Sequence, residues 1–311
     1  MPEAQSVESF DAIMIHLMAE ERLPETYSQT VQQILKPLAD KVAAWRAQIE
    51  DRPLLLGLNG AQGTGKSTLT RFLCALLEHF HGLRTAAFSL DDIYLTHAER
   101  QTLGKTVHPL FRTRGVPGTH DLGLGEATIK ALCEATPTSE TALPFFDKAQ
   151  DDRAPRERWP VFTGQPDVIL VEGWCLSARG QRLAELKEPL NQLEADEDMD
   201  GTWRSHVNER LLNDYRQFFD QFDRLVMLKA PSMECVRQWR TLQEHKLARK
   251  QGGAPGQGGS RLMTDQEVLR FVMHYERVTR CSLDEIPQRA DALIKVDSNH
   301  CFTKLTFKSA D

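Results

Sequence analysis

The chain has 311 residues, of which 41% are hydrophobic and 26% charged, and its formal net charge is −6. This composition is typical of a globular protein that buries a sizeable core in one large domain or two small ones. A negative net charge disfavours a nucleic-acid backbone as partner, and no apolar run reaches the ~18 residues that a membrane span needs. We therefore expect neither a nucleic-acid nor a membrane partner.

The six cysteines are widely scattered, and none forms a Cys-x-x-Cys pair. Their spacing predicts free thiols in a reducing compartment rather than a zinc or disulfide framework. Residues 1–25 carry many acidic side chains and have no basic leader ahead of an apolar core, which argues against a signal or transit peptide. We therefore expect a cytoplasmic protein.

Residues 1–50 predict a helical N-terminal extension packed on the main domain. Apolar side chains follow the i, i+3, i+4 pattern of an amphipathic helix over 10–18 and again over 31–45. Pro24 and Pro37 break or kink this pattern. We identify no candidate catalytic or binding residue in the extension.

Five short apolar runs follow, bounded by turn residues and separated by helical patterns. Such runs predict buried parallel strands joined by helical crossovers, here at 53–59, 84–90, 167–173, 224–230 and 291–297. The expected architecture is one α/β domain over 51–311 with a doubly wound, parallel five-stranded sheet. The acidic segment 190–201 is expected to be a solvated loop.

The first predicted strand runs directly into 57-GLNGAQGTGKSTLT-70, which contains the pattern G-x-x-x-x-G-K-[ST]. Its glycines let consecutive N–H groups turn toward phosphate oxygens, and the following helix adds its positive N-terminal end. The pattern predicts a P-loop in which Lys66 reaches the β- and γ-phosphates and Ser67 holds Mg²⁺. The expected nucleotide contacts are Gly60, Ala61, Gln62, Gly63, Thr64, Gly65, Lys66, Ser67 and Thr68.

Acidic residues follow two other predicted strands, at the sheet edge where such folds bind their ligands. In a kinase, one acid serves the metal and another accepts the proton of the acceptor hydroxyl. Asp91 is the predicted base, and Asp92 either assists it or only caps the next helix; capping is the alternative for Asp91 as well. Glu172 is expected to act on Mg²⁺, the alternative being a bond to a neighbouring backbone N–H.

The P-loop, 89-SLDDIYLT-96 and 168-VILVEGW-174 together resemble the small-molecule P-loop kinases that include phosphoribulokinase, uridine kinase and pantothenate kinase. The segment 112-RTRGVPGTHDL-122 is more specific, since it resembles the R-G-x-x-G-[ST]-H-D-L segment of plant-type D-glycerate 3-kinase and its fungal and bacterial relatives. The resemblance covers roughly residues 53–297 and continues through 144-PFFDKA-149, 153-RAPRERWP-160, 171-VEGW-174, 207-VNERLLNDY-215, 236-VRQWRTLQE-244 and 263-MTDQEVLRFVMHY-275.

This resemblance implies transfer of phosphate from ATP, with Mg²⁺, to a hydroxyl of D-glycerate, giving 3-phosphoglycerate. The implied catalytic residues are Lys66, Asp91 and Arg240, and the implied substrate contacts are Asp91, Tyr94, Arg114, His120, Asp121 and Lys148. Arg114 is the first choice for the carboxylate of glycerate. A lid over about 237–262 carries Arg240, together with Arg249 as a nucleotide contact, and its Gly-rich part 250–261 allows closure over ATP.

Alternatives remain at this stage. The arginines and the basic loop residues also fit purely structural contacts or solvated helix positions. Another acceptor, such as pantothenate, a nucleoside or a sugar phosphate, would suit the same donor motifs. A GTPase switch is disfavoured because the chain lacks the guanine-specifying N-K-x-D pattern. Both a monomer and a homodimer are compatible with the sequence.

Overall fold

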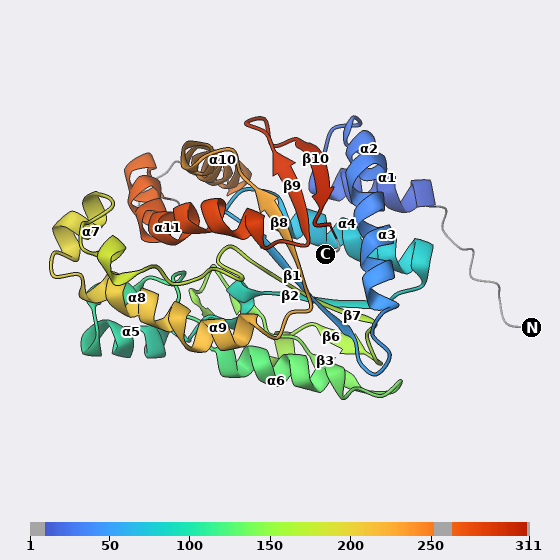
Figure 1. Ribbon diagram of the computed structural model, residues 1–311, viewed down its shortest axis with the longest axis horizontal. Coiled ribbons are helices and arrows are strands. Elements are labelled where there is room, and N and C mark those ends of the chain that lie inside the picture. The colour runs from blue at the N-terminus through green and yellow to red at the C-terminus, as the bar shows by residue number, and fades with distance from the viewer. Residues whose placement is uncertain (1–9, 252–262, 310–311) are drawn as a thin grey trace, which may run out of the picture.

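A computed structural model of the chain describes residues 10–251 and 263–309, with side chains from 10 to 245 and from 263 to 309. A six-stranded sheet crosses the molecule in the order β10-β9-β8-β1-β7-β2 (Figure 1). Its strands are β1 (Leu54–Gly60), β2 (Thr85–Ser89), β7 (Val168–Gly173), β8 (Arg224–Lys229), β9 (Ala292–Val296) and β10 (Phe302–Phe307).

The predicted α/β fold is confirmed, since all five predicted strands are present and pair in parallel. The sixth strand, β10, was not predicted; it runs antiparallel to β9 and forms one edge of the sheet. Charged side chains such as that of Lys304 interrupt its apolar pattern, which is common on edge strands.

Helices cover both faces of the sheet, because alternate strand residues point to opposite sides. Leu55 of β1 packs in one hydrophobic cluster, whereas Leu54 and Leu56 pack in the other. The first cluster is completed by α6 (Leu122–Cys133), α8 (Thr202–Leu212) and α9 (Asp214–Phe219). The second cluster is completed by α3 (Lys36–Arg46), α4 (Lys66–His81) and α10 (Met233–Gln251). Helix α11 (Asp265–Glu285) contributes side chains to both clusters.

The predicted helical extension is also confirmed, and it shares the core of the sheet. It consists of α1 (Phe10–Glu21), α2 (Tyr27–Thr30), the π-helical turn η1 (Val31–Leu35) and α3, with Pro37 in the first turn of α3. Leu38 and Val42 are fully buried in the same cluster as Phe72 of α4. The extension therefore packs directly on the helix that follows the P-loop.

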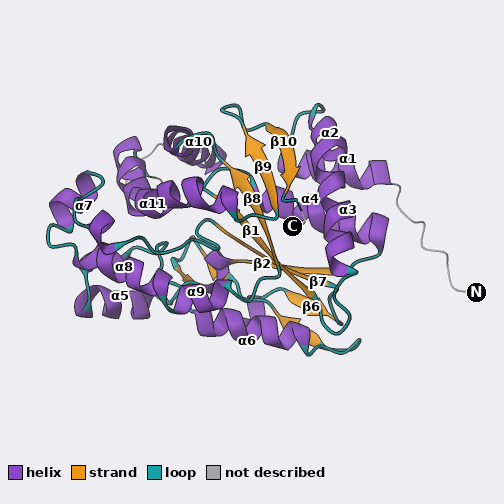
Figure 2. Cartoon of the chain, viewed as in Figure 1, coloured by secondary structure: helices purple, strands orange, loops and turns teal. Residues whose placement is uncertain are grey.

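Smaller elements lie at both ends of the strands of the large sheet (Figure 2). Helix α5 (His97–Thr106) and two short hairpins are the main ones, formed by β3 (Glu140–Ala142) with β6 (Val161–Thr163) and by β4 (Phe146–Asp147) with β5 (Asp152–Arg153). Short 3₁₀ turns complete the set: η2 (Leu90–Ile93), η3 (Pro109–Arg112), η4 (Arg156–Arg158), η5 (Leu183–Leu186) and η6 (Ile286–Gln288).

The prediction of a solvated loop at 190–201 is wrong, because this segment contains α7 (Gln192–Glu197) and two fully buried carboxylates. Glu194 accepts hydrogen bonds from Arg277 of α11 at 2.8 and 2.5 Å, and Asp198 pairs with Arg204 at 2.9 Å. Buried charges of this kind are tolerated only when they are paired and hydrogen-bonded. The arginine partners lie elsewhere in the chain, so the acidic run looked solvated in the sequence.

All six cysteines are free thiols, as predicted. None of the helices in the described ranges is both long enough and apolar enough to cross a membrane.

Replacing Leu38 by alanine should lower the free energy of unfolding by about 2–5 kcal/mol, because it leaves a cavity between α3 and the core of the sheet. Urea unfolding followed by far-UV circular dichroism measures this loss. Ile15→Ala is the control: its side chain is 67% exposed, so it should change stability by less than about 0.5 kcal/mol. Wild-type stability in Leu38→Ala would show that the extension is not part of the core.

Candidate active site

The loop between β1 and α4 has the backbone of a phosphate-binding loop. β1 ends at Gly60 and α4 begins at Lys66, so the loop leads straight into a helix N-terminus. Gly63 and Gly65 have φ angles of 78° and 92°, which residues other than glycine rarely adopt. A Cβ on Gly63 would lie 2.8 Å from the Cβ of Trp239 in α10. Turns of this kind direct backbone N–H groups into a concavity that binds anions.

Strand pairing brings Glu172 to the first turn of α4. Leu58 of β1 lies opposite Glu172 of β7, so the carboxylate is next to the loop. The Ser67 hydroxyl donates to Glu172 Oε1 at 2.8 Å, and Lys66 Nζ lies 4.0 Å from Oε2. The structure thus brings together the two predicted metal ligands and the predicted phosphate-binding lysine.

Asp91 lies at the same edge of the sheet, just beyond β2, whose Ser89 pairs with Glu172. Its carboxylate accepts hydrogen bonds from the Tyr94 hydroxyl at 2.8 Å and from Lys148 Nζ at 2.7 Å. Burial by itself would raise the pKa of Asp91, but the Lys148 ammonium and these two hydrogen bonds outweigh it and hold the pKa well below its usual range. Asp91 is therefore ionised at neutral pH.

Asp92 has a structural position, which corresponds to the capping alternative. Its Oδ2 accepts from the Ser89 backbone N–H at 3.1 Å, and the Ser89 hydroxyl caps the same turn, η2. Burial raises the pKa of Asp92 to about 6. The two neighbouring aspartates therefore have opposite pKa shifts. The pKa of Asp91, beside Lys148, is lowered, and the pKa of Asp92, at the cap, is raised.

His120 is held in a neutral form with one nitrogen left for another partner. The Tyr215 hydroxyl accepts from the backbone N–H groups of Gly118 and His120, so its own hydrogen is directed to His120 Nδ1 at 2.6 Å. Burial lowers the pKa of His120 to about 4. Its ring stacks on Tyr94 at 4.6 Å, and its Nε2 has no hydrogen-bond partner among the residues that the structure describes. Nε2 is therefore a buried donor next to the phenol that contacts Asp91.

Arg114 and Asp121, two other predicted substrate contacts, have partners within the protein. The Arg114 guanidinium pairs with Asp151 and lies 5.6 Å from the ring centroid of Phe146. Asp121 caps α6 by accepting from the Leu124 N–H at 3.0 Å. Asp121 also accepts from Arg153 at 2.9 Å, so each of its oxygens has a partner that holds the loop.

Arg240, a predicted catalytic residue, pairs within its own helix α10 and lies next to α11. It donates to Glu244 at 2.8 Å, and its guanidinium lies 5.3 Å from the ring of Phe271. Burial raises the pKa of the Tyr275 phenol, and the charges of Asp91, Arg114 and Arg240 also act on it, so all three groups lie within electrostatic reach of this phenol. The Arg249 side chain and the Gly-rich segment 252–262 lie outside the described part of the chain.

Thr68, a predicted nucleotide contact, is reached by the N-terminal extension. Its hydroxyl donates to Oε2 of Glu21 in α1 at 2.8 Å. No pattern in the sequence indicated this contact, because Glu21 lies 47 positions before Thr68 and outside the motifs.

Aromatic residues near the P-loop were also missed. The Trp239 ring contacts the His300 ring in a tilted arrangement with centroids 4.3 Å apart, and its Nε1–H donates to the Ser298 carbonyl at 3.3 Å. Phe302 of β10 lies 3.7 Å from the position of a Cβ on Gly65. The only sign in the sequence was the position of Trp239 inside the motif 236-VRQWRTLQE-244.

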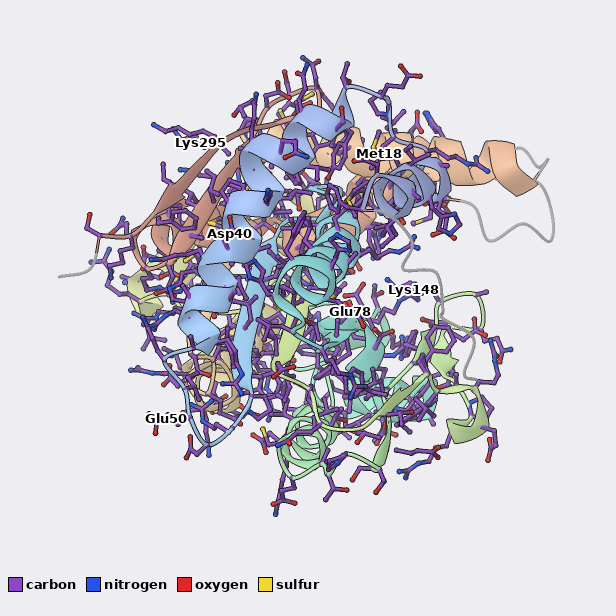
Figure 3. All side chains as sticks on the ribbon, turned by 90° about the vertical axis from the view of Figure 1, so that its right-hand side faces the viewer. Met18, Asp40, Glu50, Glu78, Lys148 and Lys295 are labelled. Atoms are coloured by element: carbon purple, nitrogen blue, oxygen red, sulfur yellow. The ribbon has the colours of Figure 1, made fainter. Side chains whose placement is uncertain are left out.

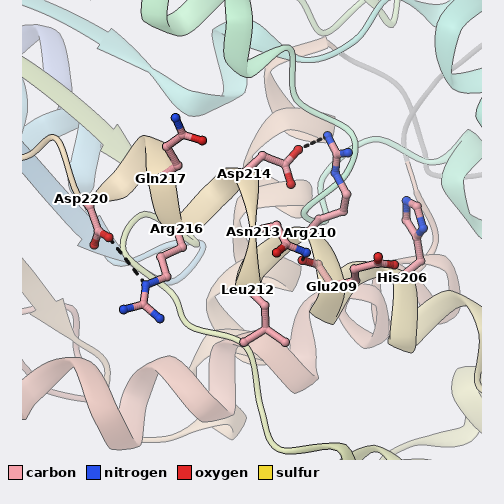
Figure 4. Close-up of a pocket in the computed structure, with 9 residues that line it drawn as sticks. All are labelled: His206, Glu209, Arg210, Leu212, Asn213, Asp214, Arg216, Gln217 and Asp220. Atoms are coloured by element: carbon pink, nitrogen blue, oxygen red, sulfur yellow. Dashed lines mark hydrogen bonds and ion pairs between the residues drawn. The ribbon is translucent and has the colours of Figure 1, made fainter.

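A groove with a volume of about 770 Å³ lies on the outer surface of α8 and α9 (Figure 4). Charged side chains line it, and they pair along the helices as Arg210 with Asp214 and Arg216 with Asp220. None of the predicted site residues is among the residues that line it. We therefore place the candidate active site at the P-loop and not in this groove.

Comparison with known proteins identifies related kinases, although no family model matches the chain. The uncharacterised kinase mug58 of Schizosaccharomyces pombe is 32% identical over 258 residues, 78% of this chain and 86% of that protein. The chloroplastic D-glycerate 3-kinase of Arabidopsis thaliana is 32% identical over 76% of this chain, which spans half of that protein's length (50%). The structure of D-glycerate 3-kinase from Cryptococcus neoformans var. grubii superposes with a TM-score of 0.72 and 26% identity, over 88% of this chain and 99% of that one.

Replacing Lys148 by methionine should raise the pKa of Asp91, because it removes the ammonium that favours the ionised carboxyl. The stability that Asp91 contributes when ionised is lost as the pH falls through its folded-state pKa, so this loss should begin at a higher pH in the variant. Carboxyl ¹³C NMR measures the titration, with Asp91→Asn to assign the signal. Lys130→Met is the control, since Lys130 pairs with Glu134 on the surface. An unchanged titration of Asp91 would contradict this electrostatic coupling.

Proposed function

The chain belongs to the family of P-loop kinases that includes D-glycerate 3-kinase and is a phosphotransferase with an alcohol group as acceptor, and on this premise we propose that it transfers phosphate from ATP to D-glycerate, giving 3-phosphoglycerate. The observation that carries the proposal is the Lys148–Asp91 pair beside the P-loop. The pair places an ammonium group, which can bind a carboxylate, next to a base that can accept the proton of a hydroxyl. Glycerate carries both a carboxylate and hydroxyl groups. Lys148 is 58% exposed and is labelled at the surface in Figure 3, where a small acid can reach it.

The donor half fits ATP with Mg²⁺. Gly63 and Gly65 shape the loop for phosphates, Lys66 lies beside it, and Ser67 and Glu172 present oxygen atoms to a metal. Within the described ranges, no three His, Cys, Asp or Glu side chains converge as an all-protein metal cage would. Mg²⁺ in kinases uses one or two protein ligands together with substrate phosphates, so this sparse donor set is the expected one. When bound, the metal neutralises charge on the transferring phosphoryl group.

The acceptor half offers cations and one buried donor. The Arg114 guanidinium lies over the ring of Phe146, and Lys148 follows Phe146 by two residues. Both cations can supply positive charge for the carboxylate. His120 Nε2–H is buried and directed away from Tyr215, and it suits a hydroxyl or carboxylate oxygen. A buried donor without a partner costs free energy, which a bound substrate oxygen would recover.

Binding of an anionic acceptor would also activate the base. In the free protein Asp91 is a weak base, because Lys148 lowers its pKa. A general base is most effective when its pKa lies near the working pH. A substrate carboxylate that draws the Lys148 ammonium away from Asp91 raises the pKa of Asp91 toward that range. Asp91 then accepts the proton of the attacking hydroxyl, while Lys66 holds the phosphates and Arg240, released from Glu244, stabilises the transferred group.

Asp91→Asn should lower kcat by about 10²–10⁴-fold, because the amide cannot accept the hydroxyl proton. ATP affinity, measured by calorimetry, should change less than twofold. Asp92→Asn is the matched control: it keeps an acceptor oxygen for the Ser89 N–H, so activity should stay near that of the wild type. Full kinase activity in Asp91→Asn would rule out Asp91 as the base.

A panel of acceptors tests the proposed substrate. D-glycerate should have the highest kcat/KM in an ADP-release assay against L-glycerate, glycerol and pantothenate, with the phosphorylated position read by NMR. Glycerol has no carboxylate to pair with Lys148 and Arg114, so its kcat/KM should be lower by a factor of at least about 30. Faster turnover of pantothenate than of either glycerate would overturn the proposal.

A further inference from the structure

Helix α1 is fixed along the P-loop helix α4 at both ends. At its start, the Phe10 ring contacts the rings of His79 and Phe80, with centroids 5.3 and 4.7 Å apart. At its last turn, Glu20 and Glu21 pair with the guanidinium of Arg71. The position of Glu21 next to the phosphate-binding loop is therefore built into the packing of the extension.

Glu21 contacts Thr68, a predicted residue of the nucleotide site. Its Oε2 accepts from the Thr68 hydroxyl at 2.8 Å, and Thr68 directly follows the proposed metal ligand Ser67. Its Oε1 pairs with Arg71. A carboxylate has about four lone-pair sites, so two contacts leave acceptor capacity on Glu21.

The surface next to this carboxylate is partly apolar. The Tyr27 ring contacts the rings of Phe72 and Phe302, with centroids 5.2 and 6.5 Å away, and Phe302 lies 3.7 Å from the position of a Cβ on Gly65. The Tyr27 hydroxyl is buried and has no hydrogen-bond partner among the described residues. Burial and then the charge of Glu21 raise the pKa of this phenol, which places the two groups within electrostatic reach of each other.

Charge determines which part of a nucleotide this corner can accept. A carboxylate next to a phosphate is repulsive, so Glu21 does not suit the phosphates that the P-loop holds. The ribose comes next along the nucleotide, and its hydroxyl groups are hydrogen-bond donors. Acidic residues accept hydrogen bonds from ribose hydroxyls in other nucleotide-binding folds.

We propose that Glu21 accepts hydrogen bonds from the ribose hydroxyls of ATP, so that the N-terminal extension forms part of the nucleotide site and selects ribonucleotides. The inference rests on the proposed use of ATP, but not on the identity of the acceptor. Tyr27 and Phe302 flank the ribose on its apolar side, and the ion pair with Arg71 orients Glu21.

Equilibrium binding by calorimetry tests the inference, with ATP and 2′,3′-dideoxy-ATP on the full chain and on two variants. Glu21→Gln should weaken ATP binding about tenfold, because a charge-assisted hydrogen bond becomes a neutral one. It should leave 2′,3′-dideoxy-ATP unchanged, so that the preference for the ribonucleotide disappears. Glu20→Gln is the matched control: it also removes a partner of Arg71 but has no contact with Thr68, and it should keep the preference.

Three results would overturn the inference. In the first, Glu21→Gln weakens the binding of ATP and of 2′,3′-dideoxy-ATP equally, which indicates that Glu21 has only a structural role. Thermal unfolding of the two variants then measures whether the fold has lost stability. In the second, ATP binds more tightly to Glu21→Gln, which shows that the carboxylate opposes the nucleotide. In the third, the wild type does not distinguish the two nucleotides. If the wild type binds neither nucleotide, the proposal that ATP is the phosphate donor is also contradicted. An error in the proposed acceptor would instead be seen only in the assay with D-glycerate and the other acceptors.

Discussion

The arrangement of the candidate site depends on one carboxylate, Glu172, at the end of a central strand. β7 pairs with β1 on one side and with β2 on the other, so Glu172 lies opposite Leu58 in one register and opposite Ser89 in the other. Its bond to Ser67 connects the P-loop helix to this strand, and Asp91 follows Ser89 by two residues. Parallel pairing places the carboxyl ends of all three strands at one edge, and this brings the proposed donor and acceptor halves of the site together.

The proposed acceptor half is held in place by a buried cation that binds backbone carbonyl groups. Arg100 is fully buried, and its guanidinium donates to the carbonyl groups of Leu95, Arg112 and Asp151. A guanidinium has five N–H donors and stays charged when buried, so it can fix several loops at once. The loop that carries Lys148 is thereby positioned next to Asp91, and the charge on Lys148 keeps Asp91 ionised.

Local patterns predicted the parts of the molecule whose structure is decided locally. The five parallel strands were found because each is a short apolar run between turn residues, and the P-loop because its glycines and Lys66 have a fixed spacing. The edge strand β10 was missed because it is half-exposed and its apolar pattern is weak. The buried carboxylates of 190–201 were misjudged because Arg204 and Arg277, which pair with them, are remote or unremarkable in the sequence.

By itself, the sequence determined the fold class, the phosphate-binding loop and the kinase family, since these depend on periodicity, glycine geometry and the order of motifs. Only the tertiary structure decided which groups share an environment. It gave neighbouring Asp91 and Asp92 opposite pKa shifts, because one faces Lys148 and the other closes a turn. It also placed Glu21 on Thr68, because α1 packs along α4. Contacts between distant segments depend on how helices and strands pack, and spacing along the chain carries no direct record of that packing.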